Sequence, residues 1–368
     1  MRILITGICG FVGSSLARYF QAAVEGIRIT GIDNLVRPGS EANRSKLRAD
    51  GIEVFHGDVR VPSDLEELSA ADWVIDAAAN PSVLAGVDGR STSRQLVEHN
   101  LMGTVNLLEY CKRHNAGLLL LSTSRVYSIP ALASVPIRVE RRAFVLDAKQ
   151  PLPPGLSAEG ISESFSVAPP VSLYGSTKLA SETLALEYGS TFGFPVWVNR
   201  CGVLAGAGQF GTAEQGIFSY WMHAHAARRP LRYIGFGGAG YQVRDAFHPE
   251  DLARLLLLQI RDTQAESDRV YNAGGGAANS MSLAELTSIC EERFGPHAPQ
   301  ADSRVRPFDL PWVVMDSGKA KRRFGWEPRR TLASILDEIA EHVHTHPGWL
   351  NLCEGMALKE EPYRVSTS

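Results

Sequence analysis

Cysteine is scarce in this chain, and its five cysteines stand far apart. They occur singly, without the paired spacing of a disulfide framework or of a zinc-binding cluster. We therefore expect a reducing, cytoplasmic location and no metal site. The five are Cys9, Cys111, Cys201, Cys290 and Cys353.

Long apolar runs and an excess of one charge are also missing. No stretch is long and apolar enough to span a bilayer, and the first residues lack the long apolar region and cleavage site of a signal peptide. Lys and Arg number 37 against 40 Asp and Glu, and the charges are scattered, so the chain has no basic surface of the kind that nucleic acids bind. The sequence therefore predicts neither a membrane nor a nucleic-acid partner, and a small molecule is the expected ligand.

The chain does have the length and apolar content of a nucleotide-binding domain with a smaller second lobe, at 368 residues and 44% hydrophobic. Short apolar runs alternate with amphipathic stretches through its first half. Such alternation is typical of a doubly wound parallel sheet, so we predict an α/β, Rossmann-like fold. The predicted strands are Arg2–Thr6, Ile27–Asp33, Trp73–Ala78, Leu118–Ser122 and Val196–Asn199, and the predicted helices are Phe11–Ala23, Thr92–His114 and Lys178–Tyr188.

Two regions interrupt the alternation. Residues from about 128 to 170 are rich in Pro, Ser and Gly, which indicates an insertion, and Ile137–Leu146 within it alternates as a small β-hairpin does. From residue 204 onward, aromatic, Gly and Arg residues precede two amphipathic stretches. These stretches predict helices at Ser282–Phe294 and Leu332–His342.

A glycine motif opens the first predicted helix. Gly7, Gly10 and Gly13 follow a strand, and such a turn aims the N–H groups of a helix N-terminus at a pyrophosphate. Asp33 ends the second predicted strand, where a carboxylate accepts hydrogen bonds from the ribose hydroxyls of an adenosine. A carboxylate there repels a 2′-phosphate, which favours NAD over NADP, although nearby Arg37 leaves NADP open.

A second motif lies at the end of a later strand and on the helix after it. Tyr174 and Lys178 are four residues apart and therefore share a helix face. An ammonium beside the phenol stabilises phenolate and lowers the pKa of the tyrosine toward the working pH. A hydroxyl from Thr123 can hold the same substrate oxygen. These residues predict that Tyr174 removes an alcohol proton while NAD takes a hydride from the same carbon.

These assignments define the expected domains. An NAD-binding domain is predicted over 1–203, with the insertion at about 128–170 inside it. A mainly substrate-binding lobe, interleaved with that domain, is predicted over 204–350. The remaining residues, 351–368, are predicted to form a C-terminal tail.

With these motifs the chain resembles the extended short-chain dehydrogenase/reductases, the NAD-dependent epimerase/dehydratase family, over nearly its whole length. The resemblance implies a homo-oligomeric enzyme, a dimer or tetramer, that acts on a nucleotide sugar, and it implies catalytic roles for Thr123, Tyr174 and Lys178. It also implies cofactor contacts beyond the glycines and Asp33. These come from Phe11, Val12, Asn34, Asp58, Val59, Ala77, Ala78 and Asn100, together with Tyr174 and Lys178.

Segments of the smaller lobe resemble the substrate-binding segments of the same family. The residues around Arg244 and around Arg306 match segments whose arginines hold the substrate diphosphate. Planar guanidinium groups bind phosphate oxygens bidentately, which suits that role. The resemblance adds Ser124 and Gln209 as further substrate contacts.

Two details narrow the expected reaction. Ser124-Arg125 stands where 4,6-dehydratases of the family have an acidic pair for elimination, which disfavours dehydration. The strings 122–128, 199–211 and 237–245 look most similar to the CDP-paratose 2-epimerase (CDP-tyvelose epimerase) branch. We therefore expect inversion at C2 of a CDP-hexose through transient NAD-dependent oxidation to a keto sugar. The alternatives are a UDP-hexose 4-epimerase and a non-catalytic nucleotide-binding sensor of the same fold.

Overall fold

A computed structural model describes residues 1–354 except 88, 90 and 263–267. Its largest sheet has the strand order β14-β10-β5-β4-β1-β2-β3, and every neighbouring pair is parallel. The order reverses between β1 and β4, where doubly wound folds open a crevice for a dinucleotide. The strands are β1 (Arg2–Thr6), β2 (Arg28–Asp33), β3 (Glu53–His56), β4 (Trp73–Asp76), β5 (Gly117–Thr123), β10 (Val196–Cys201) and β14 (Val270–Ala273).

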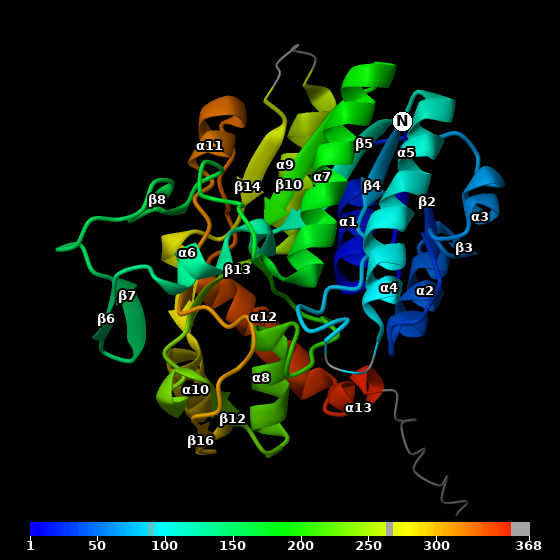
Figure 1. Cartoon of the computed structure of the whole chain (residues 1–368). Helices are drawn as coiled ribbons and strands as arrows, with labels where there is room; N and C mark the ends of the chain where they lie inside the picture. The colour runs from blue at the N-terminus through cyan, green and yellow to red at the C-terminus, as the bar shows by residue number, and fades with distance from the viewer. Residues whose placement is uncertain (88, 90, 263–267, 355–368) are drawn as a thin grey trace, which may run out of the picture.

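Two layers of helices cover the sheet (Figure 1). Ile3 and Ile5 of β1 belong to one apolar cluster, with α1 and α9, whereas Leu4 between them belongs to another, with α5 and α7. Side chains of a strand alternate between the two faces, so both faces of the sheet are buried. The predicted Rossmann-like fold class is confirmed. The four helices are α1 (Phe11–Ala23), α5 (Gly103–His114), α7 (Ser172–Phe192) and α9 (Pro249–Arg261).

A smaller lobe lies beyond one end of the sheet, in the lower half of Figure 1. In it β13 pairs with β11, β15 and β17, and β12 pairs with β16. Between β13 and β15 the chain returns to the large sheet to form α9 and β14, so the lobes are interleaved. The elements of the smaller lobe are β11 (Val203–Leu204), α8 (Ile217–Ala226), β12 (Arg232–Ile234), β13 (Val243–Phe247), β15 (Ser280–Ser282), α10 (Leu283–Phe294), β16 (Gln300–Asp302), β17 (Trp312–Val313), α12 (Leu332–Thr345) and α13 (Trp349–Cys353).

The predicted insertion contains the predicted hairpin, formed by antiparallel β6 (Ile137–Glu140) and β7 (Ala143–Leu146). The N–H of Phe144 donates to the carbonyl of Tyr241 at 2.9 Å, so the hairpin is attached to the smaller lobe. The shorter elements of the chain are α2 (Ser40–Ala49), α3 (Pro62–Glu66), α4 (Ser93–Val97), α6 (Ile129–Ala133), β8 (Leu156–Ser157), β9 (Gly160–Ile161) and α11 (Gly318–Phe324).

The structure changes some predicted boundaries. The predicted helix Thr92–His114 consists of α4, a π-helical stretch (Glu98–Met102) and α5. Helix α7 begins at Ser172, so Tyr174 as well as Lys178 lies inside it. Strand β3 was not predicted because it lies at the sheet edge and buries only Val54 of its four residues. No helix of the described part of the chain is long and apolar enough to cross a membrane.

A buried ion pair fastens α7 to the sheet. The guanidinium of Arg200 on β10 contacts the carboxylate of Glu182 on α7 at 2.7 Å, and their side chains are 8% and 3% exposed. Glu182 also accepts a hydrogen bond from Ser122 of β5. The pair therefore joins two adjacent strands to the helix that carries Tyr174.

The neighbours of Arg200 extend this network to the insertion. The hydroxyl of Tyr127 lies 3.5 Å from Arg200 and donates to Oδ1 of Asn272 at 2.7 Å. Asn272 on β14 in turn donates its side-chain amide to the carbonyl of Ile161 and its N–H to Glu163, both at 2.7 Å. Each buried polar group in this network thus has a hydrogen-bond partner within the network, as polar groups shielded from water require.

Loss of one member of this ion pair should destabilise the fold strongly. Glu182→Gln leaves the guanidinium of Arg200 buried without its counter-charge, and we expect it to lower the free energy of unfolding by about 3–5 kcal/mol. Glu98→Gln is the control, because it opens the exposed pair with Arg94 and should change the free energy of unfolding far less. Urea unfolding followed by circular dichroism measures both. Equal losses in the two variants would contradict the structural role of the buried pair.

Candidate functional site

The glycine motif forms a tight turn between β1 and α1. Gly7 has φ of 60°, and a Cβ on it would lie 2.9 Å from Cα of Ala78. A Cβ on Gly13 would lie 2.3 Å from the carbonyl oxygen of Gly7, so the helix approaches the turn only because residue 13 has no side chain. The first-turn N–H groups of α1, at Phe11 and Val12, have no partner within the helix. This end of α1 therefore fits a pyrophosphate.

Asp33 is held beside the turn by two backbone hydrogen bonds. Its carboxylate accepts the N–H of Cys9 at 2.9 Å and the N–H of Leu35 at 2.8 Å. Burial raises the pKa of Asp33, and the backbone bonds oppose that rise. A carboxylate has about four acceptor positions, so capacity remains for ribose hydroxyls.

Arg37 is the residue because of which the sequence did not exclude NADP as the cofactor. Its side chain points toward the smaller lobe. Its guanidinium donates to Oε1 of Gln215 at 2.7 Å and to the carbonyl of Phe210. These bonds occupy the cation that a 2′-phosphate would use. The geometry therefore favours NAD.

Ala77 and Ala78, which follow β4, lie against the glycine turn. Their N–H groups both donate to Oγ1 of Thr6, at 3.1 and 3.0 Å, and this hydroxyl donates to the buried carboxylate of Asp76 at 3.0 Å. Thr6 and Asp76 were not predicted as site residues. A polar residue at the end of each of two neighbouring buried strands was the available signal.

The remaining predicted cofactor residues lie at nearby loop ends. Nδ2 of Asn34 donates to Asp58 at 2.9 Å, and Asp58 is also paired with Arg60 at 2.7 Å. Burial acts to raise the pKa of Asp58, but the hydrogen bonds from Arg60 and Asn34 hold it well below its usual range. Val59 packs against Gly103 at the start of α5.

Asn100 lies in the π-helical stretch and is buried. It accepts the N–H of Asn80 at 2.8 Å, donates to the carbonyl of Asn80 at 3.1 Å and donates to Oγ1 of Thr177 at 3.3 Å. It thus ties the loop after β4 to α7. Its predicted contact with the cofactor stays a prediction.

The predicted catalytic residues come together at the end of β5. Tyr174 is buried, and its hydroxyl lies beside Thr123. Burial raises the pKa of Tyr174, whereas the hydroxyl of Thr123 and the charge of Arg125 lower it. Lys178, one turn along α7, is 2% exposed and has no hydrogen-bond partner among the residues described. Burial raises the pKa of the Cys201 thiol to about 12, against the opposing charge of Lys178.

A buried ammonium without an acceptor fits a site that a polar ligand completes, because burying a charge without partners is costly. Lys178 is such a group, and it lies on the same helix face as the phenol. Together with the turn at Gly7 and the carboxylate of Asp33, it forms a set of donors and acceptors that fits NAD. A hydroxyl of the nicotinamide ribose is the expected acceptor for Lys178.

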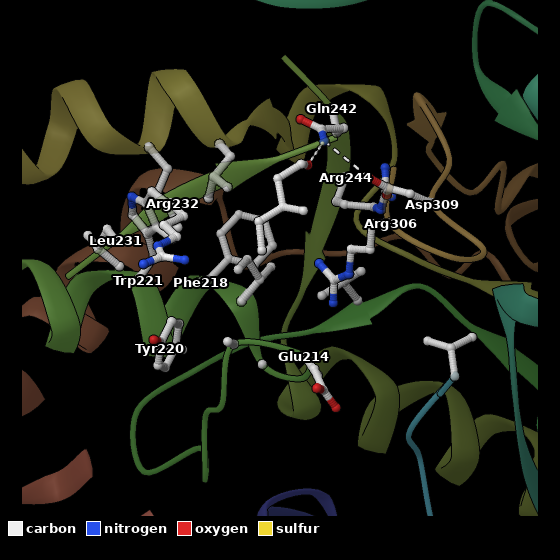
Figure 2. Close-up of a pocket in the computed structure, with 18 of the residues that line it drawn as sticks. Glu214, Phe218, Tyr220, Trp221, Leu231, Arg232, Gln242, Arg244, Arg306 and Asp309 are labelled. Carbon is white, nitrogen blue, oxygen red and sulfur yellow. Dashed lines mark hydrogen bonds and ion pairs between the residues drawn. The ribbon is translucent and has the colours of Figure 1, made fainter. Parts of the chain in front are cut away.

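A cavity of about 300 Å³ lies next to this cluster, a volume in the range of small-molecule sites. It is polar at one end and largely apolar at the other. Figure 2 shows Gln242, Arg244, Arg306 and Asp309 at one end, and Phe218, Tyr220, Trp221, Leu231 and Arg232 at the other.

The structure brings the two predicted diphosphate-binding arginines to the polar end (Figure 2). Arg244 is paired with Asp309 at 3.3 Å, and both side chains are at most 15% exposed. Gln242 donates to the same carboxylate at 3.1 Å and so keeps it in place. The guanidinium of Arg306 has no hydrogen-bond or ion-pair partner among the described residues and is available to an anion.

The two other predicted substrate contacts differ in position. Ser124 is buried directly after Thr123, at the start of a 3₁₀ turn. Gln209 does not line the cavity: its amide donates to the carbonyl of Leu204 at 2.8 Å, and its side chain packs against Gly216. The substrate contacts predicted for Gln209 and Ser124, neither of which lines the cavity, stay predictions.

Known proteins are similar to this chain over most of its length. The model of the NAD dependent epimerase/dehydratase family matches residues 3–274. A CDP-paratose 2-epimerase of Salmonella typhi is 28% identical over 89% of this chain and 95% of its own length. A UDP-glucose 4-epimerase of Corynebacterium glutamicum is 25% identical over 92% of this chain and 94% of its own.

Solved structures show the same fold. A UDP-glucuronic acid 4-epimerase of Bacillus cereus, in complex with UDP-glucuronic acid and NAD, superimposes with a TM-score of 0.74. The match covers 94% of this chain and 99% of that one, at 23% identity. The chain belongs to the NAD dependent epimerase/dehydratase family. The predicted family, enzyme class and NAD dependence are thereby confirmed, whereas the roles assigned to single residues stay predictions.

Removal of the phenol hydroxyl should separate catalysis from cofactor binding. We expect Tyr174→Phe to lower kcat by about 10³-fold, because the variant lacks the group that accepts the proton, while its NAD content is unchanged. Tyr188→Phe on the same helix is the control, since that hydroxyl contacts exposed Glu109. Activity of Tyr174→Phe near that of the control would contradict the proposed mechanism.

Loss of the Asp33 carboxylate should weaken the binding of NAD and not the binding of the nucleotide sugar. Asp33→Asn removes a charged acceptor, and we expect NAD affinity to fall about ten- to a hundredfold, as for a hydrogen bond to a charged group. Nucleotide-sugar affinity should change little. Asp50→Asn, at an exposed carboxylate, is the matched control. Calorimetric titration with NAD decides the point, and unchanged affinity in Asp33→Asn would mean that the carboxylate does not contact the ribose.

Proposed function

We propose that the protein is a nucleotide-sugar epimerase that inverts C2 of a CDP-hexose of the paratose and tyvelose type. The observation that carries the proposal is the position of Arg125, two residues after Thr123, in the lining of a cavity whose polar end presents Arg244 and Arg306. A cavity with two cations at one end and aromatic side chains at the other suits a nucleoside diphosphate. The similarity to the Salmonella typhi CDP-paratose 2-epimerase supports the base and the carbon.

In this proposal the residues at the end of β5 handle one proton. Thr123 and Tyr174 hold the hydroxyl of the reacting carbon, and the phenolate of Tyr174 accepts its proton. Lys178 favours the phenolate by its charge and binds the nicotinamide ribose. NAD, when bound, would supply reversible hydride transfer at that carbon. Tyr174 then gives the proton back to the oxygen of the inverted alcohol.

The smaller lobe keeps the substrate attached while its ring turns. Inversion requires the intermediate keto sugar to present its opposite face, so the hexose has to rotate within the site. Arg244 and Arg306 are proposed to hold the diphosphate throughout, because bidentate guanidinium–phosphate bonds fix it in position. In this view residues 1–203 mainly bind the cofactor and 204–350 mainly bind the substrate, although α9 and β14 belong to the large sheet.

A second candidate is a UDP-hexose 4-epimerase, which the similarity to the Corynebacterium glutamicum enzyme supports. A nucleotide sensor without turnover is disfavoured, because a buried phenol beside Thr123 and Lys178 suits proton transfer, for which a binding protein has no need. Homo-oligomeric assembly and a cytoplasmic location stay predictions.

The carbon and the course of the reaction can be measured together. We expect a panel of CDP-, UDP-, GDP- and dTDP-hexoses to give inversion at C2 with CDP-hexoses. In D2O the inverted product should contain no deuterium at C2, since the hydrogen of that carbon is retained in the site and does not exchange with water. NMR of the products reads both results. Deuterium at C2 would indicate deprotonation instead, and inversion at C4 of a UDP-hexose with CDP-hexoses inert would establish the second candidate.

A further inference from the structure

Arg125 occupies the junction between the catalytic cluster and the cavity. It lies in the 3₁₀ turn Ser124–Val126, directly after Thr123. A Cβ on Gly175 would lie 2.3 Å from the carbonyl oxygen of Arg125, so α7 packs against this turn only because the residue after Tyr174 is glycine. The side chain of Arg125 lines the cavity. The position of Arg125 is therefore fixed by the contact between α7 and the turn that follows β5.

The guanidinium of Arg125 uses only part of its bonding capacity. Nη1 donates to the carbonyl of Phe308 at 2.9 Å, and no other partner occurs among the residues described. A guanidinium has five N–H donors. Phe308 belongs to the same loop as Arg306 and Asp309, so this one bond sets the direction of the side chain. The remaining donors are left for a ligand in the cavity.

The charges around Arg125 show what that ligand has to provide. Burial and the nearby charge of Arg244 lower the pKa of Arg125 to about 10, whereas the charge of Asp309 opposes the change. Asp309 is already paired with Arg244. Three arginines thus face one carboxylate at this end of the cavity. Two of the positive charges suit a diphosphate, and the third, that of Arg125, acts on the phenol of Tyr174.

We propose that Arg125 is a specificity-determining residue that binds the hexosyl part of the substrate and acts by its charge on Tyr174, while Arg244 and Arg306 bind the diphosphate. The inference rests on the proposed function only for the substrate class, a nucleoside diphosphate hexose. It does not depend on the base or on the inverted carbon. The titratable groups around the phenol are Arg125 on the 3₁₀ turn, Cys201 on β10 and Lys178 on its own helix.

The binding part of the proposal can be tested by comparing ligands with and without the sugar. Arg125→Met should weaken binding of CDP-glucose about tenfold and change binding of CDP less than about twofold, because a lost hydrogen bond to an uncharged sugar oxygen costs roughly 1–1.5 kcal/mol. Arg306→Met is the matched control and should weaken both ligands by the same factor. Calorimetry measures all of these affinities, with UDP and UDP-glucose as a second pair of ligands.

The effect of the Arg125 charge on Tyr174 is tested separately, by the pH dependence of kcat/KM. Loss of the positive charge should raise the pKa of Tyr174, so the acidic limb of kcat/KM against pH should move up by about one unit in Arg125→Met. Activity at pH 7 then falls about tenfold and recovers as the pH rises. Arg125→Lys keeps the charge and should restore the profile. Arg306→Met should leave the limb in place.

Two outcomes would overturn the inference. Equal weakening of CDP and CDP-glucose in Arg125→Met would make Arg125 a third diphosphate ligand or a brace for the loop at Phe308. A pH profile that is unshifted in both Arg125 variants would show that the charge of Arg125 does not lower the pKa of Tyr174. If CDP-hexoses are inert and UDP-hexoses react, the proposed function fails, and the UDP pair still tests Arg125. Circular dichroism and NAD content show that each variant is folded.

Discussion

The buried ion pair between Glu182 and Arg200 is the interaction on which the site depends. It places a helix and two strands in one register, because a desolvated carboxylate and guanidinium have to meet at hydrogen-bonding distance. Ser122, bonded to the same carboxylate, is the residue before Thr123. Tyr174 lies two helical turns before Glu182. The distance between the hydroxyl of Thr123 and the phenol of Tyr174 is therefore set by Glu182 and its partners, which do not line the cavity.

Close backbone approach is the second constraint on this site. Gly13 lets α1 reach the turn at Gly7, and Gly175 lets α7 reach the turn at Arg125. In each case a side chain would occupy space within 2.3 Å of a carbonyl oxygen. Both contacts lie at the carboxyl ends of parallel strands, where loops from separate βα units converge. The cofactor end and the substrate end of the site are thus shaped by the same physical requirement.

The two lobes are joined by side chains that bind backbone groups across the crevice. Arg37, near the predicted ribose site, donates to the carbonyl of Phe210. Arg125, beside the phenol, donates to the carbonyl of Phe308. Such bonds hold loops of the smaller lobe against the larger one. The interleaved path through α9 and β14 adds covalent continuity between the two lobes.

The sequence by itself determined the parts that depend on local periodicity and on spacing within one segment. The strand Arg2–Thr6, the helix Phe11–Ala23 and the hairpin at Ile137–Leu146 follow from apolar alternation. The glycine turn, Asp33 and the shared face of Tyr174 and Lys178 follow in the same way. Only the tertiary structure decided contacts between distant segments. It placed Arg125 beside Phe308, directed Arg37 toward Gln215 and bonded Gln209 to Leu204. The direction of a long polar side chain is set by which acceptor lies within reach, and that acceptor comes from another part of the fold.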